Sequence, residues 1–171
     1  PVIRDAQARG WLAPGCRVVP SRAKVFAQLV ESDYLRSMSR LDEGACGFRV
    51  PAAVAADIDS DSPFDIPLGR LLRSGQARTL SEPFEAWQIG FELDALPPVG
   101  GRSRAIDVRV TRRGCVDAVA FWWACDLGGD GVHVIDSKPA AETDGGGPHQ
   151  DHWLQAFTRV GGAGPAEEEG E

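Results

Sequence analysis

The distribution of hydrophobic and polar positions predicts a chain built mainly of β-strands. Residues 23–31 form a run rich in apolar and β-branched side chains, in which Lys24 and Gln28 are interspersed. Such a run is typical of a strand that is buried on one face and partly covered on the other. Residues 84–92 predict a second strand, whose apolar face is formed by Trp87, Ile89 and Phe91.

The second half of the chain continues this pattern. Residues 106–111 alternate apolar and polar side chains and predict a half-buried strand. Residues 115–127 predict a long strand with two apolar faces, one made of Val119, Phe121, Trp123 and Cys125 and the other of Ala118, Ala120, Trp122 and Ala124. The glycines of residues 128–131 then predict a tight hairpin turn into residues 132–135, because glycine accepts the positive φ that such turns require.

Helical signals are few and short. Residues 3–12 fit a short helix that stops at Pro14-Gly15, and residues 68–72 fit either a short strand or a helical turn. Many strands with little helix predict a mainly β fold, an antiparallel β-barrel or sandwich. We divide the chain into residues 1–15 as a linker with a short helix, residues 16–160 as the β-barrel domain, and residues 161–171 as a disordered acidic tail.

Length and composition limit the classes of function that fit this chain. A length of 171 residues fits one domain, and no stretch approaches the roughly 20 apolar residues that span a bilayer. A net charge of −7 argues against binding to a nucleic-acid backbone. The chain opens on Pro1 and its single methionine, Met38, is internal, so we expect a fragment. We interpret the four cysteines as buried, reduced thiols of a cytoplasmic or nuclear protein; they are Cys16, Cys46, Cys115 and Cys125.

Common catalytic motifs do not occur. No glycine-rich turn opens a helix to hold a nucleotide, and no GxSxG elbow presents a serine nucleophile. His149 and His152, with Cys125, Asp126 and Asp151, could in principle supply zinc ligands. Residues three apart in a strand point to opposite faces, however, so the spacing of His149 and His152 argues against a shared metal site.

The segment Asp151-His152-Trp153 is the strongest candidate site. A carboxylate beside an imidazole can fix its tautomer or keep it protonated, and an indole offers a flat face to a planar cation such as guanidinium. The alternative is that Trp153 only packs on the core and His152 lies on the surface. Of the other tryptophans, we expect Trp123 in the core and Trp122 over a sheet face or partner surface, and we read Trp11 and Trp87 as core or domain-contact residues.

Three segments together resemble a known family. Residues 19–32 resemble the first barrel strand of the protein arginine methyltransferase 7 subfamily, and residues 121–127 resemble a later barrel strand of the same proteins. Residues 151–155, Asp-His-Trp-Leu-Gln, are similar to the segment that corresponds to the Thr-His-Trp loop of the wider protein arginine methyltransferase family. The motifs occur in the same order with similar spacing over most of residues 1–160.

This resemblance implies a substrate-side β-barrel that packs under a Rossmann-like domain, which binds S-adenosylmethionine and is absent from this chain. The family's two guanidinium-gripping glutamates lie on that domain, so no complete catalytic set is expected here. Only Asp151, His152 and Trp153 carry over as substrate-binding residues, with His152 paired to a carboxylate across the groove and Trp153 shaping its wall. The implied partners are arginine-containing, arginine/glycine-rich protein substrates, and a dimer or tandem-module contact.

Two other functions remain open. The chain could be a non-catalytic β-sandwich that binds a protein partner without S-adenosylmethionine. A metal-dependent enzyme using His149 and His152 is the third reading.

Overall fold

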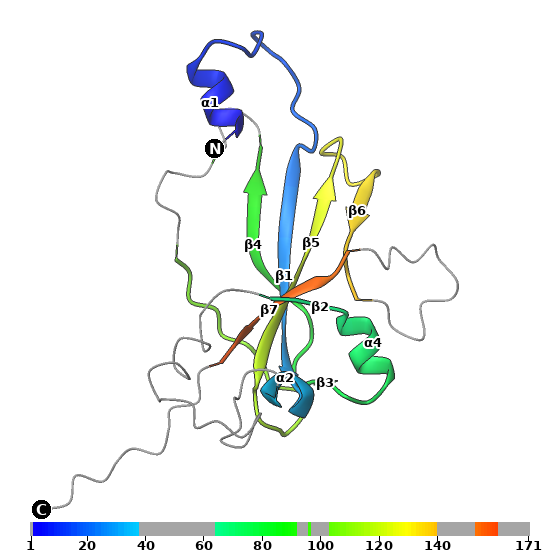
Figure 1. Ribbon diagram of the computed structural model, residues 1–171. Coiled ribbons are helices and arrows are strands. Elements are labelled where there is room, and N and C mark those ends of the chain that lie inside the picture. The colour runs from blue at the N-terminus through cyan, green and yellow to red at the C-terminus, as the bar shows by residue number, and fades with distance from the viewer. Residues whose placement is uncertain (1, 38–63, 92–95, 97–102, 140–152, 161–171) are drawn as a thin grey trace, which may run out of the picture.

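The structure is a computed structural model that describes residues 2–37, 64–91, 96, 103–139 and 153–160. One antiparallel seven-stranded sheet dominates it and curls as it runs from β4 to β2 (Figure 1). The predicted mainly β, antiparallel fold is therefore confirmed. The strands are β1 (Arg22–Glu31), β2 (Phe64–Ile66), β3 (Arg78–Thr79), β4 (Phe84–Gly90), β5 (Ala118–Asp126), β6 (Val134–Asp136) and β7 (Gln155–Arg159).

The ladder between β1 and β5 is the centre of the sheet. These two long strands pair antiparallel over nine registered positions, from Arg22 opposite Asp126 to Val30 opposite Ala118. β4 covers the other edge of β1, with a register shift at Val25 and Phe26. β7 pairs with β5, and β2 with β7, so the strands that contain residues of the three matched segments, β1, β5 and β7, belong to one continuous sheet.

The predicted hairpin after β5 is confirmed. Gly129 and Gly131 have φ angles of 84° and 75°, in the region that favours glycine. The carboxylate of Asp126 accepts hydrogen bonds from the backbone N–H groups of both glycines, at 2.8 and 3.0 Å. Leu127 N–H donates to His133 O at 2.9 Å and closes the turn, which returns the chain into β6.

The two faces of the sheet differ in how well they are covered. Residues paired across an antiparallel ladder share a face, so one face carries Val30, Ala118 and Ala120, all fully buried. The α4 helix (Leu68–Arg73) packs on this helix-side face through Leu68 and Leu71, and Leu35 and Phe157 complete the cluster. The opposite face has half-buried large side chains instead, namely Val25, Leu29, Trp87, Ile89, Phe121 and Trp123.

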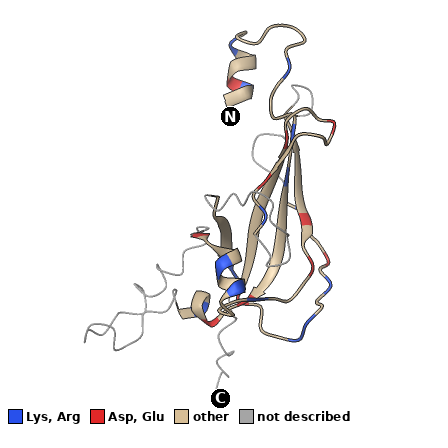
Figure 2. Ribbon diagram, turned by 90° about the vertical axis from the view of Figure 1, so that its right-hand side faces the viewer, with Lys and Arg blue, Asp and Glu red and all other residues tan. Residues whose placement is uncertain are grey.

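Two further helices lie outside this core. The α1 helix (Val2–Ala8) has no buried residue and lies at one end of the sheet (Figure 1). The α2 helix (Asp33–Ser37) follows β1 directly and buries Leu35. None of the helices among the described residues has the length and apolar character needed to cross a membrane. Acidic and basic segments are interspersed along the described chain (Figure 2).

Several sequence-based predictions need correction. Residues 106–109 form no strand: Val110 makes only an isolated bridge with Ser81, because this segment finds no second strand to pair with along its length. The faces of the two central tryptophans are also reversed. Trp122 lies on the helix-side face and is 4% exposed, whereas Trp123 lies on the opposite face and is half-buried.

Trp11 does not lie in the core and Cys115 is not buried, so these parts of the sequence-based predictions are wrong, whereas a domain contact of Trp11 stays a prediction. Trp11 is 71% exposed and lies under the guanidinium of Arg9, 5.1 Å from the ring centre. Cys115 is exposed, Cys16 and Cys125 are half-buried, and these three are free thiols. Cys46 lies outside the described residues. The domain limits at residues 15 and 160 stay predictions.

Asp117, just before β5, fixes α2 to the sheet. Its carboxylate oxygens accept hydrogen bonds from Arg36 Nε and Nη2 at 2.9 and 2.8 Å and from the backbone N–H of Ser32 at 2.9 Å. Burial by itself raises the pKa of Asp117, but the hydrogen bonds from Arg36 and Ser32 outweigh it and hold the pKa below the ordinary value near 3.8.

Replacing Asp117 with asparagine is expected to lower the free energy of unfolding at pH 7 by about 2 kcal/mol, because Arg36 loses its buried partner. The lowered pKa gives a stabilisation that is fully present above the unfolded value near 3.8 and is lost as the pH falls through the folded pKa. Urea unfolding at pH 7 and pH 3 should therefore show a smaller deficit at pH 3. Asp107→Asn, at an exposed position, serves as the control, and an equal deficit at both pH values would contradict this account.

Candidate functional site

Trp153 is the one member of the predicted site that the structure describes. It is half-buried, and its ring lies 4.9 Å from that of Trp123, tilted by 59°. Trp123 projects from β5 on the opposite face, so Trp153 lies on that face too. Tilted aromatic pairs at this distance attract each other through their ring edges and faces. The indole of Trp153 is therefore held against a rigid central strand.

Gln155 holds the backbone beside Trp153. Its side chain is 5% exposed, and its Nε2 donates to Trp153 O at 3.0 Å and to Ser137 O at 2.9 Å. Its Oε1 accepts from the first N–H of α4, that of Leu68, at 3.0 Å. One amide thus joins three segments that lie far apart in the sequence, and it uses both its donor and acceptor groups to do so.

Ser137 extends this network to Trp123. Its hydroxyl accepts from Trp123 N–H at 3.0 Å and donates to Trp123 O at 2.9 Å. Ser137 is 2% exposed, so these bonds form away from water. Both tryptophans of the pair are therefore connected to Gln155, Trp153 directly and Trp123 through Ser137. The arrangement fixes the backbone at both tryptophans, and the contact between the rings positions the indole of Trp153. A positioned indole face is what contact with a planar cation requires.

The rest of the predicted site is not placed. Asp151 and His152 lie outside the described residues, so their assignment as substrate-binding residues stays a prediction. Gln155 belongs to the segment that carries the family resemblance, but the sequence alone predicts no role for it. The signal that could have found it is a glutamine at the start of an apolar strand, since a buried polar side chain requires several hydrogen-bond partners.

The hypothesis of a zinc site is not supported by those of its candidate ligands that the structure describes, Cys125 and Asp126. Cys125 is half-buried, and burial raises the pKa of its thiol, which opposes the thiolate form that binds zinc. Asp126 uses both carboxylate oxygens in the β5–β6 turn. Over the described ranges, no group of three His, Cys, Asp or Glu residues could hold a metal ion. His149, Asp151 and His152 lie outside those ranges.

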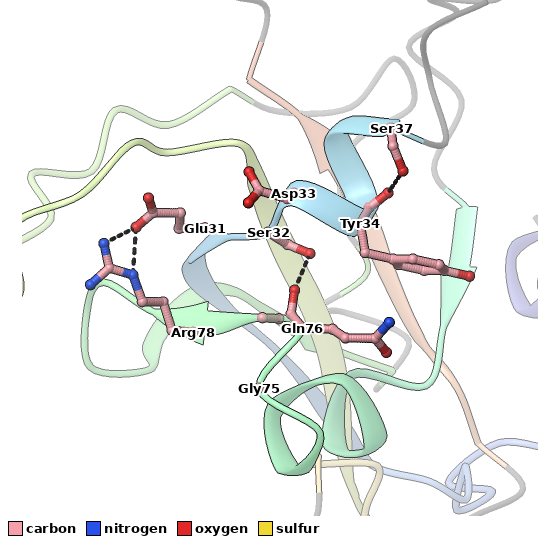
Figure 3. A pocket seen from close by; sticks show the side chains of 9 residues that line it. Glu31, Ser32, Asp33, Tyr34, Ser37, Gly75, Gln76 and Arg78 are labelled. Atoms are coloured by element: carbon pink, nitrogen blue, oxygen red, sulfur yellow. Dashed lines mark hydrogen bonds and ion pairs between the residues drawn. The ribbon is translucent and has the colours of Figure 1, made fainter.

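A cavity of about 520 Å³ opens at the end of β1, next to α2 (Figure 3). Its charged side chains are already partnered: Arg78 Nε donates to Glu31 Oε2 at 2.6 Å, and Asp33 pairs with Arg36 at 3.0 Å. Ser32 Oγ donates to Gln76 O at 2.7 Å. Because these contacts hold the end of β1, α2 and residues 75–78 together, we read them as structural. Trp153 is not part of this cavity's lining.

Comparison with known proteins points to one family. Protein arginine N-methyltransferase 7 of Danio rerio is 32% identical over 164 residues, which cover 90% of this chain and 22% of that protein. Those of Caenorhabditis briggsae and Oryza sativa subsp. japonica are each 30% identical, over 84% and 92% of this chain and 21% and 23% of the relative. No protein-family model matches the chain.

The chain thus spans about a fifth of the length of these curated relatives. The mainly β, antiparallel fold agrees with the barrel that the resemblance of residues 19–32, 121–127 and 151–155 implies. On the strength of three relatives from animals and a plant that align with most of its residues, this chain belongs to the protein arginine N-methyltransferase family, as a segment related to protein arginine N-methyltransferase 7.

Proposed function

We propose that this chain supplies one wall of the substrate-arginine groove in an S-adenosylmethionine-dependent protein arginine N-methyltransferase. The observation that carries the proposal is the fixed indole of Trp153, packed on Trp123 and anchored through Gln155, in a segment similar to protein arginine N-methyltransferase 7. A planar, always charged guanidinium is well matched by a flat aromatic face. His152 next to it would pair with a carboxylate across the groove.

The proposed reaction is direct displacement. A guanidino nitrogen attacks the sulfonium methyl of S-adenosylmethionine, the carbon–sulfur bond breaks, and the arginine nitrogen loses a proton. Orientation of the two reactants supplies much of such a rate enhancement. Trp153 would contribute orientation by restricting the guanidinium plane. We assign no described residue to the cofactor, whose cradle we expect in a part of the methyltransferase outside this chain.

The substrates that fit this proposal are proteins with exposed arginines, such as arginine/glycine-rich segments. The net charge of −7 would favour their approach, since an acidic surface attracts cationic peptides at long range. The size of the pocket, and with it the number of methyl groups transferred, depends on residues across the groove.

Trp153→Ala in the longest protein product that contains this chain is expected to lower methyl transfer to an arginine/glycine-rich peptide about tenfold, because the guanidinium loses one wall. The readout is incorporation of a radiolabelled methyl group from S-adenosylmethionine. Trp153→Phe should keep most activity, since a flat ring remains. Leu154→Ala, the exposed neighbour, is the matched control. Wild-type activity in Trp153→Ala, or a wild-type product inert to the donor, would contradict the proposal.

A second candidate is a non-catalytic interaction module. The half-buried side chains of Trp87, Phe121 and Trp123 on the opposite face favour it, because large apolar faces mark contact surfaces. The same assay separates the two functions: an interaction module transfers no methyl group and binds its partner without S-adenosylmethionine.

A further inference from the structure

A second cavity, of about 430 Å³, lies on the helix-side face of the sheet. Gln28 of β1 and Trp122 of β5 contribute its sheet-side lining, because both project from the face on which α4 packs. Leu72 of α4, Pro83 before β4 and Pro139 after β6 line it from other elements. A volume of this size falls in the range of about 300–1,000 Å³ that holds small ligands.

Among the described residues that line this cavity, the charged side chains are all cationic. They are Arg78, Arg112 and Lys138, and the described lining includes no aspartate or glutamate. Arg78 is neutralised by its ion pair with Glu31. Neither Arg112 nor Lys138 forms an ion pair with an acidic side chain of the described chain. Lys138 does interact electrostatically with the carboxylate of Asp136, which is not among the described lining residues. Arg112 and Lys138 thus both bring positive charge to this cavity, although the chain as a whole has a net charge of −7.

The rest of the lining is mostly apolar. Trp122 is 4% exposed and its ring stacks on Phe26, with centroids 6.0 Å apart and an angle of 22°. Leu72, Ala77, Pro83 and Pro139 add further apolar surface. Arg112 and Lys138 are exposed, so they reach the cavity from its solvent side, whereas Trp122 lies in the interior. Apolar and cationic lining together suit a ligand with both a ring and an acidic group.

We propose that this cavity binds a small aromatic phosphate ester. A phosphate monoester carries a charge of about −1.5 to −2 near neutral pH, which matches the two cations of Arg112 and Lys138. The planar guanidinium of Arg112 can donate two parallel hydrogen bonds to phosphate oxygens. The aromatic ring of the ligand lies against the apolar lining around Trp122. The site is distinct from that of Trp153, which packs against the opposite face of the sheet.

The test is a ligand-detected NMR titration of the 171-residue chain with phenyl phosphate. Saturable binding is expected, and it should be tighter than the binding of inorganic phosphate, which lacks the ring, or phenol, which lacks the charge. The double variant Arg112→Gln, Lys138→Gln should weaken phenyl phosphate about tenfold or more. The double variant Arg104→Gln, Arg109→Gln changes the net charge equally at exposed positions outside the lining, and should weaken it less than about twofold.

A charge-keeping variant, Arg112→Lys with Lys138→Arg, is expected to bind within about threefold of the wild type. It keeps the test decisive if the neutral variant loses its fold, which circular dichroism would reveal. Absence of saturable binding to the folded wild type would overturn the proposal. Equal weakening by the two neutral double variants would also overturn it, as would inorganic phosphate binding as tightly as phenyl phosphate. These assays need no methyl donor, so their outcome is independent of the proposed methyltransferase function.

Discussion

Phe157→Ala is expected to lower the free energy of unfolding by about 3–5 kcal/mol, the range found for large-to-small changes in well-packed cores. Phe157 is 3% exposed and lies in the main core cluster with Val30 and Leu71. It pairs with Ala120 of β5, whose small side chain leaves the ring of Phe157 to fill this part of the core. The surrounding strands cannot collapse into the space that it leaves.

Urea unfolding followed by circular dichroism measures this loss. Phe157→Leu keeps most of the volume and should cost much less, about 1 kcal/mol. Val160→Ala, at a 43% exposed position just after β7, is the control and should change stability by less than about 0.5 kcal/mol. If Phe157→Ala lost under 1 kcal/mol, then β7 would not belong to the core as described.

Gln155→Glu is expected to destabilise the chain by about 2–4 kcal/mol at neutral pH, since it removes both side-chain donors while keeping the size. The carboxylate can still accept from Leu68 N–H, but it faces the carbonyl oxygens of Ser137 and Trp153, which lose their donor. Burial and these carbonyls would both disfavour the charged form. The introduced carboxyl should therefore have a pKa above the ordinary glutamate value.

The sign of the pH dependence follows. Because the folded pKa is raised, the folded state binds more protons, and the variant loses stability as the pH rises from about 4 towards the folded pKa. The wild type should show no such trend from this position. Unfolding midpoints between pH 4 and pH 8 measure the effect, with Gln88→Glu on the exposed side of β4 as the control. A pH-independent deficit would show that the amide's donors do not support this network.

The same variant also links the fold to the proposed site. If Gln155 positions Trp153, then Gln155→Glu in the longer protein should reduce methyl transfer at a temperature where the variant remains folded. Trp153→Ala leaves all three partners of the Gln155 amide in place, because the amide bonds to the backbone oxygen of residue 153 and not to the indole, so it should lower activity with a smaller loss of stability. The two changes thus separate the ring that contacts substrate from the side chain that positions it.

The sequence by itself determined the strands that carry the sheet. The apolar run at residues 23–31 and the double-faced run predicted at residues 115–127 correspond to β1 and β5, and β5 occupies Ala118–Asp126 of the latter run. Long apolar segments of this kind are stable as paired central strands. The glycines after Asp126 likewise determined the β5–β6 turn, since few other residues accept its positive φ angles. The family resemblance of these segments was also visible without the structure.

Only the tertiary structure decided which face each side chain serves. Alternation separates Trp122 from Trp123, but it cannot say on which side α4 packs, and here the helix covers Trp122. The segment at residues 106–111, predicted as a strand from its alternation, forms only one isolated bridge, through Val110. A strand needs a neighbouring strand to pair with, and the local sequence does not show whether one is present. Gln155 and the three cations of the second cavity come together from distant segments for the same reason: hydrogen bonds and charges act across space, and the sequence records only neighbours along the chain.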